Sequence, residues 1–295
     1  MTTEDFIIET YCLTDDEYKI LIKKHGKLRS RGFSPKLSDS EVITMEIIGE
    51  YLGYHTDKSI WKYFKNNMKN LFPNISSRSS FVKQSANLWY IKQLLHKSIV
   101  CHHTEINDLH VVDGFPIPIC HYCRSSRCKS FRGEADYGYC SAKDEKYYGF
   151  KGHIIVDSNG IIKSFTFANP TIDERVALLD ICENIKGTLL GDKGYLKKEL
   201  SDELLEYGIY LQTPVRSNMK ESRPKWILKF MRSKRKIVET VIAQLGKVFS
   251  IQAIRVKDMW HLTNRMARKI LAHNICTVIN IKFGLNILSI EPIVN

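Results

Sequence analysis

Apolar residues recur at helical intervals through the first hundred residues of the chain. A clear run consists of Val42, Met45, Ile48 and Leu52. Spacing of three and four positions puts such side chains on one face of an α-helix. The same pattern predicts a helix from near Phe81 to Ile99. Thr14 with Glu17, and Ser38 with Glu41, have capping-box spacing and predict two helix starts. We therefore expect an all-helical N-terminal segment.

Beyond this segment the pattern changes to short apolar runs bounded by turn residues, which is typical of strands. The predicted strands are Leu109–Val112, Tyr148–Val156, Ile161–Ala168, Thr188–Gly191 and Ile209–Thr213. The tetrapeptide Asp157–Gly160, between the second and third of these, is a hairpin signal. Helices are expected at Glu174–Asn184, Lys198–Tyr207 and Lys234–Phe249, and a polar loop at Cys120–Lys146.

The order of these elements predicts an α/β fold. Three strands are followed by a helix, a strand, a helix, a strand and a long helix, which is the order of a ribonuclease-H-like mixed sheet flanked by helices. We expect an all-helical N-terminal domain over residues 1–104 and the α/β domain, with a basic C-terminal helix, over residues 105–295. Short helices that carry Lys and Arg suit a domain that binds DNA ends, and they suit any helical scaffold nearly as well.

Charge narrows the range of partners. The chain holds 44 Lys and Arg against 32 Asp and Glu, a formal charge of +12. A surplus of this size favours a polyanionic partner, because each cation that meets a phosphate releases condensed counterions. Some soluble proteins are basic without binding nucleic acid, so charge alone leaves that alternative open.

The apolar segments are too short or too interrupted for a membrane span, which needs roughly 20 residues. Ile270–Ile290 comes nearest, and polar residues including His273 and Asn274 interrupt it. The N-terminus lacks the features of a secretory signal peptide. We expect a cytoplasmic protein whose 8 cysteines are reduced thiols.

Two aspartates follow predicted strands. Asp113 ends the run LHVVD and Asp192 ends TLLGD. If these strands are neighbours, both carboxylates emerge at the same edge of the sheet. Either aspartate alone is more typical of a turn, but their joint placement favours a shared site. Phosphodiester chemistry would use such a site, because two magnesium ions roughly 3.5–4 Å apart, held by carboxylates, stabilise both the entering and the leaving oxygen.

Glu239 is the third candidate acid. It lies in the predicted helix RKIVETVIAQLGKVF, away from the apolar stripe and near Ala243 and Gly246. Those small residues leave room for the close approach of DNA. A solvated glutamate on a helix surface would show the same pattern.

The chain resembles the DDE transposases of bacterial insertion sequences, in particular the insertion sequence 982 family. The matching passages are LSDSEVITMEIIGEYLG, TDKSIWKYF, VVDGFPIPIC, FRGEADYGYC, YYGFKGH, LLGDKGY, RKIVETVIAQL and DMWHL, in the expected order. The resemblance implies a ribonuclease-H-like catalytic core, dependence on Mg²⁺ with Mn²⁺ as a substitute, and action on the inverted-repeat ends of a mobile element. It assigns the three catalytic, metal-binding acids to Asp113, Asp192 and Glu239.

One part of the wider class pattern is missing. That class often carries Tyr, Arg, Glu and Lys around the third acid. Here Arg235 precedes Glu239 at the right interval, but Arg232 stands in the Tyr place and Gly246 in the Lys place, with Lys247 next to it. The departure leaves the three acids intact and puts in doubt how those neighbours would position a DNA end.

A basic segment with interleaved aromatics precedes the glutamate helix. Cations there fix DNA through its phosphates, and the aromatics can stack on an unpaired base; a solvated basic helix explains the pattern equally well. His153 on the second strand could touch the scissile phosphate or be a structural histidine. The predicted DNA contacts are His153, Lys193, Arg223, Lys225, Trp226, Lys229, Arg232, Lys234, Arg235 and Lys236. A second basic group comprises Arg255, Lys257, Arg265, Arg268 and Lys269.

Cysteine spacing gives only half of a zinc motif. Cys120, Cys123 and Cys128 fit one side of a zinc ribbon, but a second close pair is missing, so we do not expect structural zinc. Asp173 is the best substitute should one of the three acids be misassigned, and its other interpretation is a helix N-cap.

The expected function is therefore that of a transposase, which cleaves DNA at element ends and joins them to target DNA. The expected partners are double-stranded DNA (terminal inverted repeats and target) and a second copy of the chain in a homodimer, with no membrane and no small-molecule cofactor. A ribonuclease-H-like nuclease that never joins DNA, or a DNA-binding remnant without activity, would share these features. We find no P-loop, G-x-S-x-G, G-x-G-x-x-G or H-E-x-x-H sequence that would indicate another chemistry.

Overall fold

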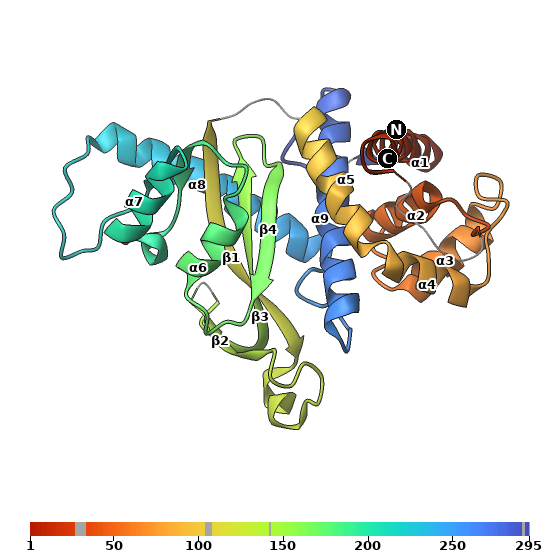
Figure 1. The fold of residues 1–295 in the computed structure, drawn as a ribbon, viewed down its shortest axis with the longest axis horizontal. Coiled ribbons are helices and arrows are strands. Elements are labelled where there is room, and N and C mark those ends of the chain that lie inside the picture. The colour runs from red at the N-terminus through yellow and green to blue at the C-terminus, as the bar shows by residue number, and fades with distance from the viewer. Residues whose placement is uncertain (27–33, 104–107, 142, 291–292, 295) are drawn as a thin grey trace. The chain divides into compact units, whose positions relative to one another are not determined.

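The computed structural model describes residues 1–26, 34–103, 108–141, 143–290 and 293–294 (Figure 1). The chain divides into two compact units. One, the helical unit, comprises Met1–Thr104, Gln244–Ile251 and Val256–Asn295. The other, the sheet unit, comprises Glu105–Ala243 and Gln252–Arg255. An N-terminal helical region and a mixed α/β region are therefore both present, as the apolar pattern predicted.

The helical unit packs around its C-terminal helix. Its helices are α1 (Thr3–His25), α2 (Asp39–Tyr51), α3 (Asp57–Asn67), α4 (Arg78–Asn87), α5 (Trp89–His102) and α9 (Met259–Lys282). From Met266 to Asn280 every residue of α9 is buried, and α5 and α2 pack along it. The helix that was expected to end the α/β domain is thus the central helix of the other unit. Among the described residues, no helix is both long enough and apolar enough to cross a membrane.

Two details of the helix predictions are corrected by the structure. Ser38 and Glu41 do form a capping box at the start of α2. Thr14 and Glu17, in contrast, lie buried inside α1, which begins at its own capping box of Thr2 with Asp5. The helix expected from Phe81 to Ile99 is two helices, α4 and α5, that meet at Leu88.

A network of buried charges ties α2, α3, α5 and α9 together. Arg268 reaches Glu50 at 2.5 Å, Asp57 at 2.7 Å and Glu46 at 3.2 Å. Lys269 lies 2.6 Å from Glu50. Around these, Lys92 pairs with Glu46 and Arg265 with Asp57. Arg265, Arg268 and Lys269, expected on a C-terminal helix, are on α9, with their cations directed to carboxylates of the unit's own interior.

Ion pairing outweighs burial for the acids of this network. Burial by itself would raise the pKa of Glu50, but the charges of Arg268 and Lys269 and hydrogen bonds from His55 and Lys269 lower it far below its usual range. Asp57 is shifted in the same direction by Arg268 and Arg265, against the same desolvation. These carboxyls stay ionised in the interior because several cations surround each of them.

The sheet unit contains a six-stranded mixed sheet. Its strands are β1 (Leu109–Cys120), β2 (Asp136–Cys140), β3 (Glu145–Asp157), β4 (Ile162–Ala168), β5 (Gly187–Leu190) and β6 (Ile209–Gln212). Their order is β2-β3-β1-β5-β6, with β4 also paired to β3. β1 pairs antiparallel with β3 and parallel with β5, and β5 pairs parallel with β6. Helix α6 (Glu174–Ile181) packs on β3 and β4 (Figure 1). The predicted fold class, a mixed sheet flanked by helices, is confirmed.

Several elements differ from the predictions in their extent. β1 continues eight residues past Val112, so Asp113 lies within the strand and not at its end. The expected loop at Cys120–Lys146 contains strand β2 and a short 3-10 helix, η1 (Tyr122–Arg127). The last predicted helix, α8 (Lys225–Lys247), begins nine residues earlier than its apolar stripe indicated. Helix α7 (Lys198–Glu206) lies as expected between β5 and β6.

Two prolines shape the second half of β1. Beyond Val111, the last residue paired with β5, the strand that β1 pairs with among the described residues is β3. Pro116 and Pro118 lie in this part, opposite Lys151 and Gly149 of β3. A proline has no N–H to donate, so it is tolerated where a strand has an unpaired side. Because they are two residues apart, both prolines turn their nitrogens to the same side of the strand.

Candidate active site

Asp113 and Asp192 are brought together by the parallel pairing of β1 and β5. The last paired residues of the two strands are Val111 and Leu190, which lie opposite each other. Each aspartate stands two residues after its member of that pair. The side chains therefore emerge near one edge of the sheet. Among the described residues, neither aspartate forms an ion pair, and each accepts a backbone hydrogen bond, Asp113 from Gly114 at 2.8 Å and Asp192 from Gly194 at 2.7 Å.

Asp113 binds protons more tightly than an ordinary aspartate. Burial raises its pKa to about 6. The hydrogen bond from Gly114 and the charge of Arg235 oppose that rise, while the negative charges of Asp192 and Glu174 add to it. A half-buried carboxyl beside other carboxyls is a site where a cation would be favoured, because a cation removes the cost of ionising the group.

Glu174 is a third carboxylate beside the two aspartates. A methyl group placed on Gly194 would lie 2.9 Å from Asp192 Oδ1 and 3.2 Å from Glu174 Oε2, so these oxygens lie within about 6 Å of each other. The Lys151 ammonium donates to Glu174 Oε1. Sequence reasoning missed Glu174 and considered its neighbour Asp173. Asp173 is the N-cap of α6, where it accepts from the Arg175 N–H.

His153 and Tyr195 lie behind the carboxylates. His153 is opposite Gly114 in the β1–β3 pairing, and it is only 2% exposed. Burial, together with the charge of Lys151, lowers its pKa to about 4, so its imidazole is neutral at pH 7. Its Nδ1 lies 3.4 Å from the Tyr195 hydroxyl. Burial and the nearby charges of Glu174, Asp113 and Asp192 raise the pKa of Tyr195. His153 thus contacts a neutral phenol in this state.

Glu239 lies on α8, one turn after Arg235. The Arg235 guanidinium is close enough to Asp113 to lower its pKa. Residues four apart on a helix share a face, so Glu239 follows on the face that carries Arg235, and it is exposed. Among the residues that the structure describes, no three His, Cys, Asp or Glu side chains are grouped closely enough to hold a metal ion. The charges of Asp192 and Glu174 act on Asp113 and raise its pKa, and Glu239 is an exposed residue of α8.

The predicted DNA contacts on α8 form an exposed basic and aromatic surface. Trp226 is 70% exposed and Phe230 46%, and the Lys234 ammonium lies over the Phe230 ring. Exposed cations on the same helix are Lys225, Lys229, Arg232 and Lys236. Lys193, directly after Asp192, is also exposed.

Arg223 differs from the other predicted contacts. Its guanidinium is held by Glu221 at 2.8 Å, by the Thr213 carbonyl at 2.9 Å and by Gln212 at 3.2 Å. These bonds occupy its donors, so in this structure Arg223 fixes the segment between β6 and α8. A phosphate contact would require it to leave its partners.

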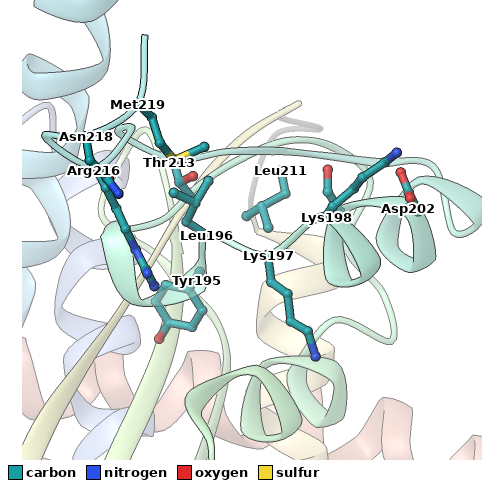
Figure 2. A pocket seen from close by; sticks show the side chains of 11 residues that line it. Tyr195, Leu196, Lys197, Lys198, Asp202, Leu211, Thr213, Arg216, Asn218 and Met219 are labelled. Atoms are coloured by element: carbon teal, nitrogen blue, oxygen red, sulfur yellow. The ribbon is translucent and has the colours of Figure 1, made fainter. Parts of the chain in front are cut away.

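A cavity of about 480 Å³ adjoins the aspartate edge (Figure 2). Tyr195 is shared between it and the carboxylate site. Figure 2 shows the Arg216 side chain reaching toward the Tyr195 ring. Lys197, Lys198 and Asp202 line it as well, with Leu196 and Leu211 as apolar wall. Apolar walls with several cations suit a nucleotide, which has a flat base and a charged phosphate.

The three cysteines Cys120, Cys123 and Cys128 lie together near the end of β1 and η1. Burial and a hydrogen bond with Cys128 raise the pKa of the Cys120 thiol. A raised pKa favours the protonated thiol, while a metal binds the thiolate. All of the chain's 8 cysteines are free thiols.

Comparisons with known proteins identify the family and the fold of the chain. A family model described as a transposase DDE domain matches residues 103–259, more than half of the chain. Among solved structures, the chain is similar to a piggyBac transposase in a synaptic complex with hairpin DNA, with a TM-score of 0.53 and 11% sequence identity. That match covers 98% of this chain and 75% of the other, and at such low identity it bears on the fold alone. No curated protein matches the chain.

Proposed function

Because the chain belongs to the family of transposase DDE domains, we propose that it cleaves DNA at the ends of a mobile element and joins those ends to target DNA. Asp113, Asp192 and Glu239 are the acids of the proposed site. The observation that carries the proposal is the β1–β5 pairing, which sets Asp113 and Asp192 two residues beyond the opposed residues Val111 and Leu190. The insertion sequence 982 family is the branch that the sequence passages favour.

The oxygen donors of the proposed acids are of the kind that suits a hard divalent cation, although among the described residues they are not grouped as closely as bound ligands would be. Carboxylate oxygens are the ligands that Mg²⁺ and Mn²⁺ prefer. Asp113, Asp192 and Glu239 would hold the ions, with their negative charge only partly offset by Lys151 and Arg235. When bound, such ions polarise the phosphoryl oxygens and activate the attacking hydroxyl or water.

The remaining side chains have separate tasks in this proposal. Asp113 and Asp192 would hold the ions, which would supply the charge that orients the reacting phosphate. His153, which is neutral, keeps Tyr195 in place by its Nδ1 contact. The positive charge of Arg235 partly offsets the negative charge of Asp113 and lowers its pKa. No side chain is needed as a covalent nucleophile, because each step is an in-line displacement by water or by a DNA 3′-hydroxyl.

Two surfaces of the sheet unit suit the DNA strand. Exposed cations on α8 would contact phosphates without reading sequence. Trp226 and Phe230 on the same helix would stack on unpaired bases. The cavity with Arg216, Lys197 and Lys198 would receive the nucleotide next to the reacting phosphate (Figure 2).

The helical unit would hold the double-stranded part of the element end. A cavity of about 680 Å³ in this unit is lined by the exposed cations Lys58, Arg78 and Lys83 and by Trp260, which is 49% exposed. None of these three cations forms an ion pair with another described residue. Their free charges and the N-terminal ends of α3 and α4 favour phosphate groups.

Two other functions remain as outcomes of the test. A nuclease on the same fold would cut DNA without joining it, and an inactive relative would only bind. A homodimer that pairs two element ends is part of the proposal, and it would appear as two protein copies per pair of ends in the DNA complex.

The decisive experiment is cleavage and joining of labelled element-end DNA with Mg²⁺, Mn²⁺ or EDTA. Wild type should give metal-dependent cleaved and joined products. Asp113→Asn and Asp192→Asn should lose both by roughly a thousandfold, equivalent to about 4 kcal/mol, and should bind DNA as before. Cleavage without joining of a pre-cut 3′-hydroxyl end would identify the nuclease, and full activity of Asp192→Asn would refute the assignment of that acid.

A further inference from the structure

The segment between β1 and β2 carries positive charge of one sign only. Residues 121–133, with the sequence HYCRSSRCKSFRG, contain four Lys and Arg and no Asp or Glu: Arg124, Arg127, Lys129 and Arg132. We propose that this segment, which we call the basic arm, is a binding surface for target DNA, a duplex that is held through its phosphates. This inference rests on the proposed function, because it names where the second DNA substrate of the joining step is held.

The charges of the basic arm are free to meet a partner. All four cations are exposed, and none of them forms an ion pair with another residue that the structure describes. The first acid in this stretch of sequence is Glu134, directly after the arm. A surface of one charge sign repels a second copy of itself and attracts a polyanion. The phosphates of DNA fit this charge, because cations that meet them release condensed counterions.

Contacts with the sheet hold the basic arm in one conformation. Phe131 is buried, and its ring packs edge-on against Phe150 of β3 with the centroids 5.4 Å apart. Tyr137 of β2 donates a hydrogen bond to Ser125 Oγ at 3.1 Å, and the Ser125 hydroxyl donates to the Tyr122 carbonyl at 2.7 Å. Because η1 is fixed to β2 and β3 in this way, less of the chain has to become ordered when a phosphate binds.

Exposed tyrosines add a second kind of contact beside these cations. Tyr122 of η1 is 46% exposed, and Tyr137 and Tyr139 of β2 are 48% and 56% exposed. The hydroxyls of Tyr137 and Tyr139 donate to Ser125 and Asp144. The Tyr122 hydroxyl has no hydrogen bond to another residue in the described part of the chain. It is therefore available to donate to a phosphate oxygen.

The basic arm lies at a distance that a duplex at the proposed site would reach. β1 ends at Cys120, where the arm begins, and in this part β3 pairs with β2 beyond the last residue that it pairs with β4 (Figure 1). Cys120 is seven residues after Asp113, which is about 20 Å at the rise of a strand. DNA advances about 3.4 Å per base pair, so the arm would meet a duplex about six base pairs from the reacting phosphate.

The chemistry of the arm suits target DNA better than the element end. Arg, Lys and Tyr side chains that meet phosphates position a duplex without reading its bases. An element end has to be distinguished from other DNA, while a target can be bound without being read. The other partner that this region could take is a second copy of the chain, because β2 is the edge strand of the sheet. The test below separates these partners.

The first measurement is binding of the full chain to a labelled duplex without element sequence, by fluorescence anisotropy over a series of salt concentrations. Arg124→Ala and Arg127→Ala should each lower the slope of log affinity against log salt by about 0.9. Tyr122→Phe should weaken binding roughly threefold and leave the slope unchanged, because a hydroxyl releases no counterion. Lys186→Ala is the matched control with an unchanged slope, since it removes an exposed lysine next to β5 and the start of β1, away from the arm.

The second measurement is joining of a pre-cut element end, which assigns the surface to the target. The double variant Arg124→Ala with Arg127→Ala should cleave element ends as wild type does. For joining it should need roughly ten times more target DNA. Circular dichroism checks that each variant is folded.

Three results would overturn the inference. The arm does not bind DNA if both arginine variants keep the wild-type slope. It holds the element end, and not the target, if the double variant loses cleavage as much as joining. It is a protein interface if the variants change the number of associated copies in analytical ultracentrifugation and leave the slope unchanged. Wild-type joining with unchanged slopes in the variants refutes the basic arm alone, whereas a wild type that yields no joined product refutes the proposed function.

Discussion

Two groups of acids, one in each unit, have opposite electrostatic environments. In the helical unit, Glu46, Glu50 and Asp57 meet four cations on α5 and α9, and the pKa of Glu50 falls. In the sheet unit, Asp113 lies beside Asp192 and Glu174, and its pKa rises to about 6. In the helical unit, Lys and Arg side chains balance the negative charges of the carboxylates. Around Asp113, negative charge remains in excess.

The difference distinguishes carboxyls whose ion pairs stabilise the fold from carboxyls that are left without an ion pair. Desolvating a carboxylate is costly in both places, so a protein that only had to fold would surround each one with cations, as α9 does. Leaving Asp113 and Asp192 without an ion pair keeps the metal-free protein less stable than it could be. That cost is typical of sites that are organised for a ligand.

The largest expected effect is on the helical network. Arg268→Met removes the cation shared by Glu46, Glu50 and Asp57 and leaves their charges buried without it. We expect a loss of about 3–5 kcal/mol in the free energy of unfolding, measured by urea denaturation. Lys19→Met breaks an ion pair whose lysine is 68% exposed and should change stability by no more than about 0.5 kcal/mol. Equal losses in the two variants would contradict this account.

A smaller effect is expected from His273, a buried base on α9. Burial lowers the pKa of His273 to about 4, and its Nε2 lies 2.9 Å from Gln244 Oε1. The unfolded chain takes up this proton at its ordinary pKa near 6.5, so stability is complete above that value and falls as the pH drops toward 4, by up to about 3 kcal/mol. In urea denaturation between pH 4 and 7, the free energy of unfolding of the wild type should rise with pH in this way. In His273→Gln the number of protons taken up on unfolding should be smaller by about one.

For the active site we expect a gain in stability on loss of a charge. The unfolded chain loses the Asp113 proton at an ordinary pKa near 3.9, while the folded chain keeps it up to a pKa of about 6. This carboxyl therefore lowers stability as the pH rises through that window, and the cost persists above it. Asp113→Asn should raise the free energy of unfolding by about 1–2 kcal/mol at pH 8 in EDTA, less than the full shift because water reaches the site. A lower free energy of unfolding in this variant would show that a positive charge of the protein already balances the Asp113 carboxylate.

The smallest effect concerns cations that are exposed and unpaired. Arg78→Ala with Lys83→Ala should leave urea unfolding unchanged, unlike Arg268→Met. If each cation contacts one phosphate, the slope of log affinity against log salt should fall by about 0.9 per residue. Fluorescence anisotropy with element-end DNA measures that slope. Lys62→Ala with Lys65→Ala, on the neighbouring helix α3, is the control and should leave the slope unchanged.

Local signals explain why much of the fold was predictable. Periodicity located most helices and strands, and the Asp157–Gly160 turn predicted the β3–β4 hairpin. β2 was missed because the sequence from Asp136 to Cys140, with Tyr137 and Tyr139 both exposed, has no apolar face of its own and is held by pairing with β3. The early start of α8 was missed because its first turns, around Lys225 and Trp226, are exposed and leave no apolar stripe.

In the candidate site, too, only residues marked by a local sequence pattern could be predicted. Asp113 and Asp192 were identified because each follows a short apolar run in sequence. Glu174 has no such signal, since its position depends on where α6 packs against β3. The predicted capping box at Thr14 and Glu17 failed for a related reason. Glu17 accepts from Ser98 of α5 and contacts His102 and His103, a set of partners 80 residues or more away.

The prolines of β1 have a consequence for how the protein behaves at high concentration. A long strand with one unpaired side is a template on which other chains can add strands and aggregate. Pro116 and Pro118 remove two of the donors that an added strand would need. The same stretch of strand begins beside Asp113, where the proposed function would require open space for DNA. The two prolines therefore reduce aggregation through the unpaired side of β1 next to the proposed site. Replacing both prolines should first lower the solubility of the protein.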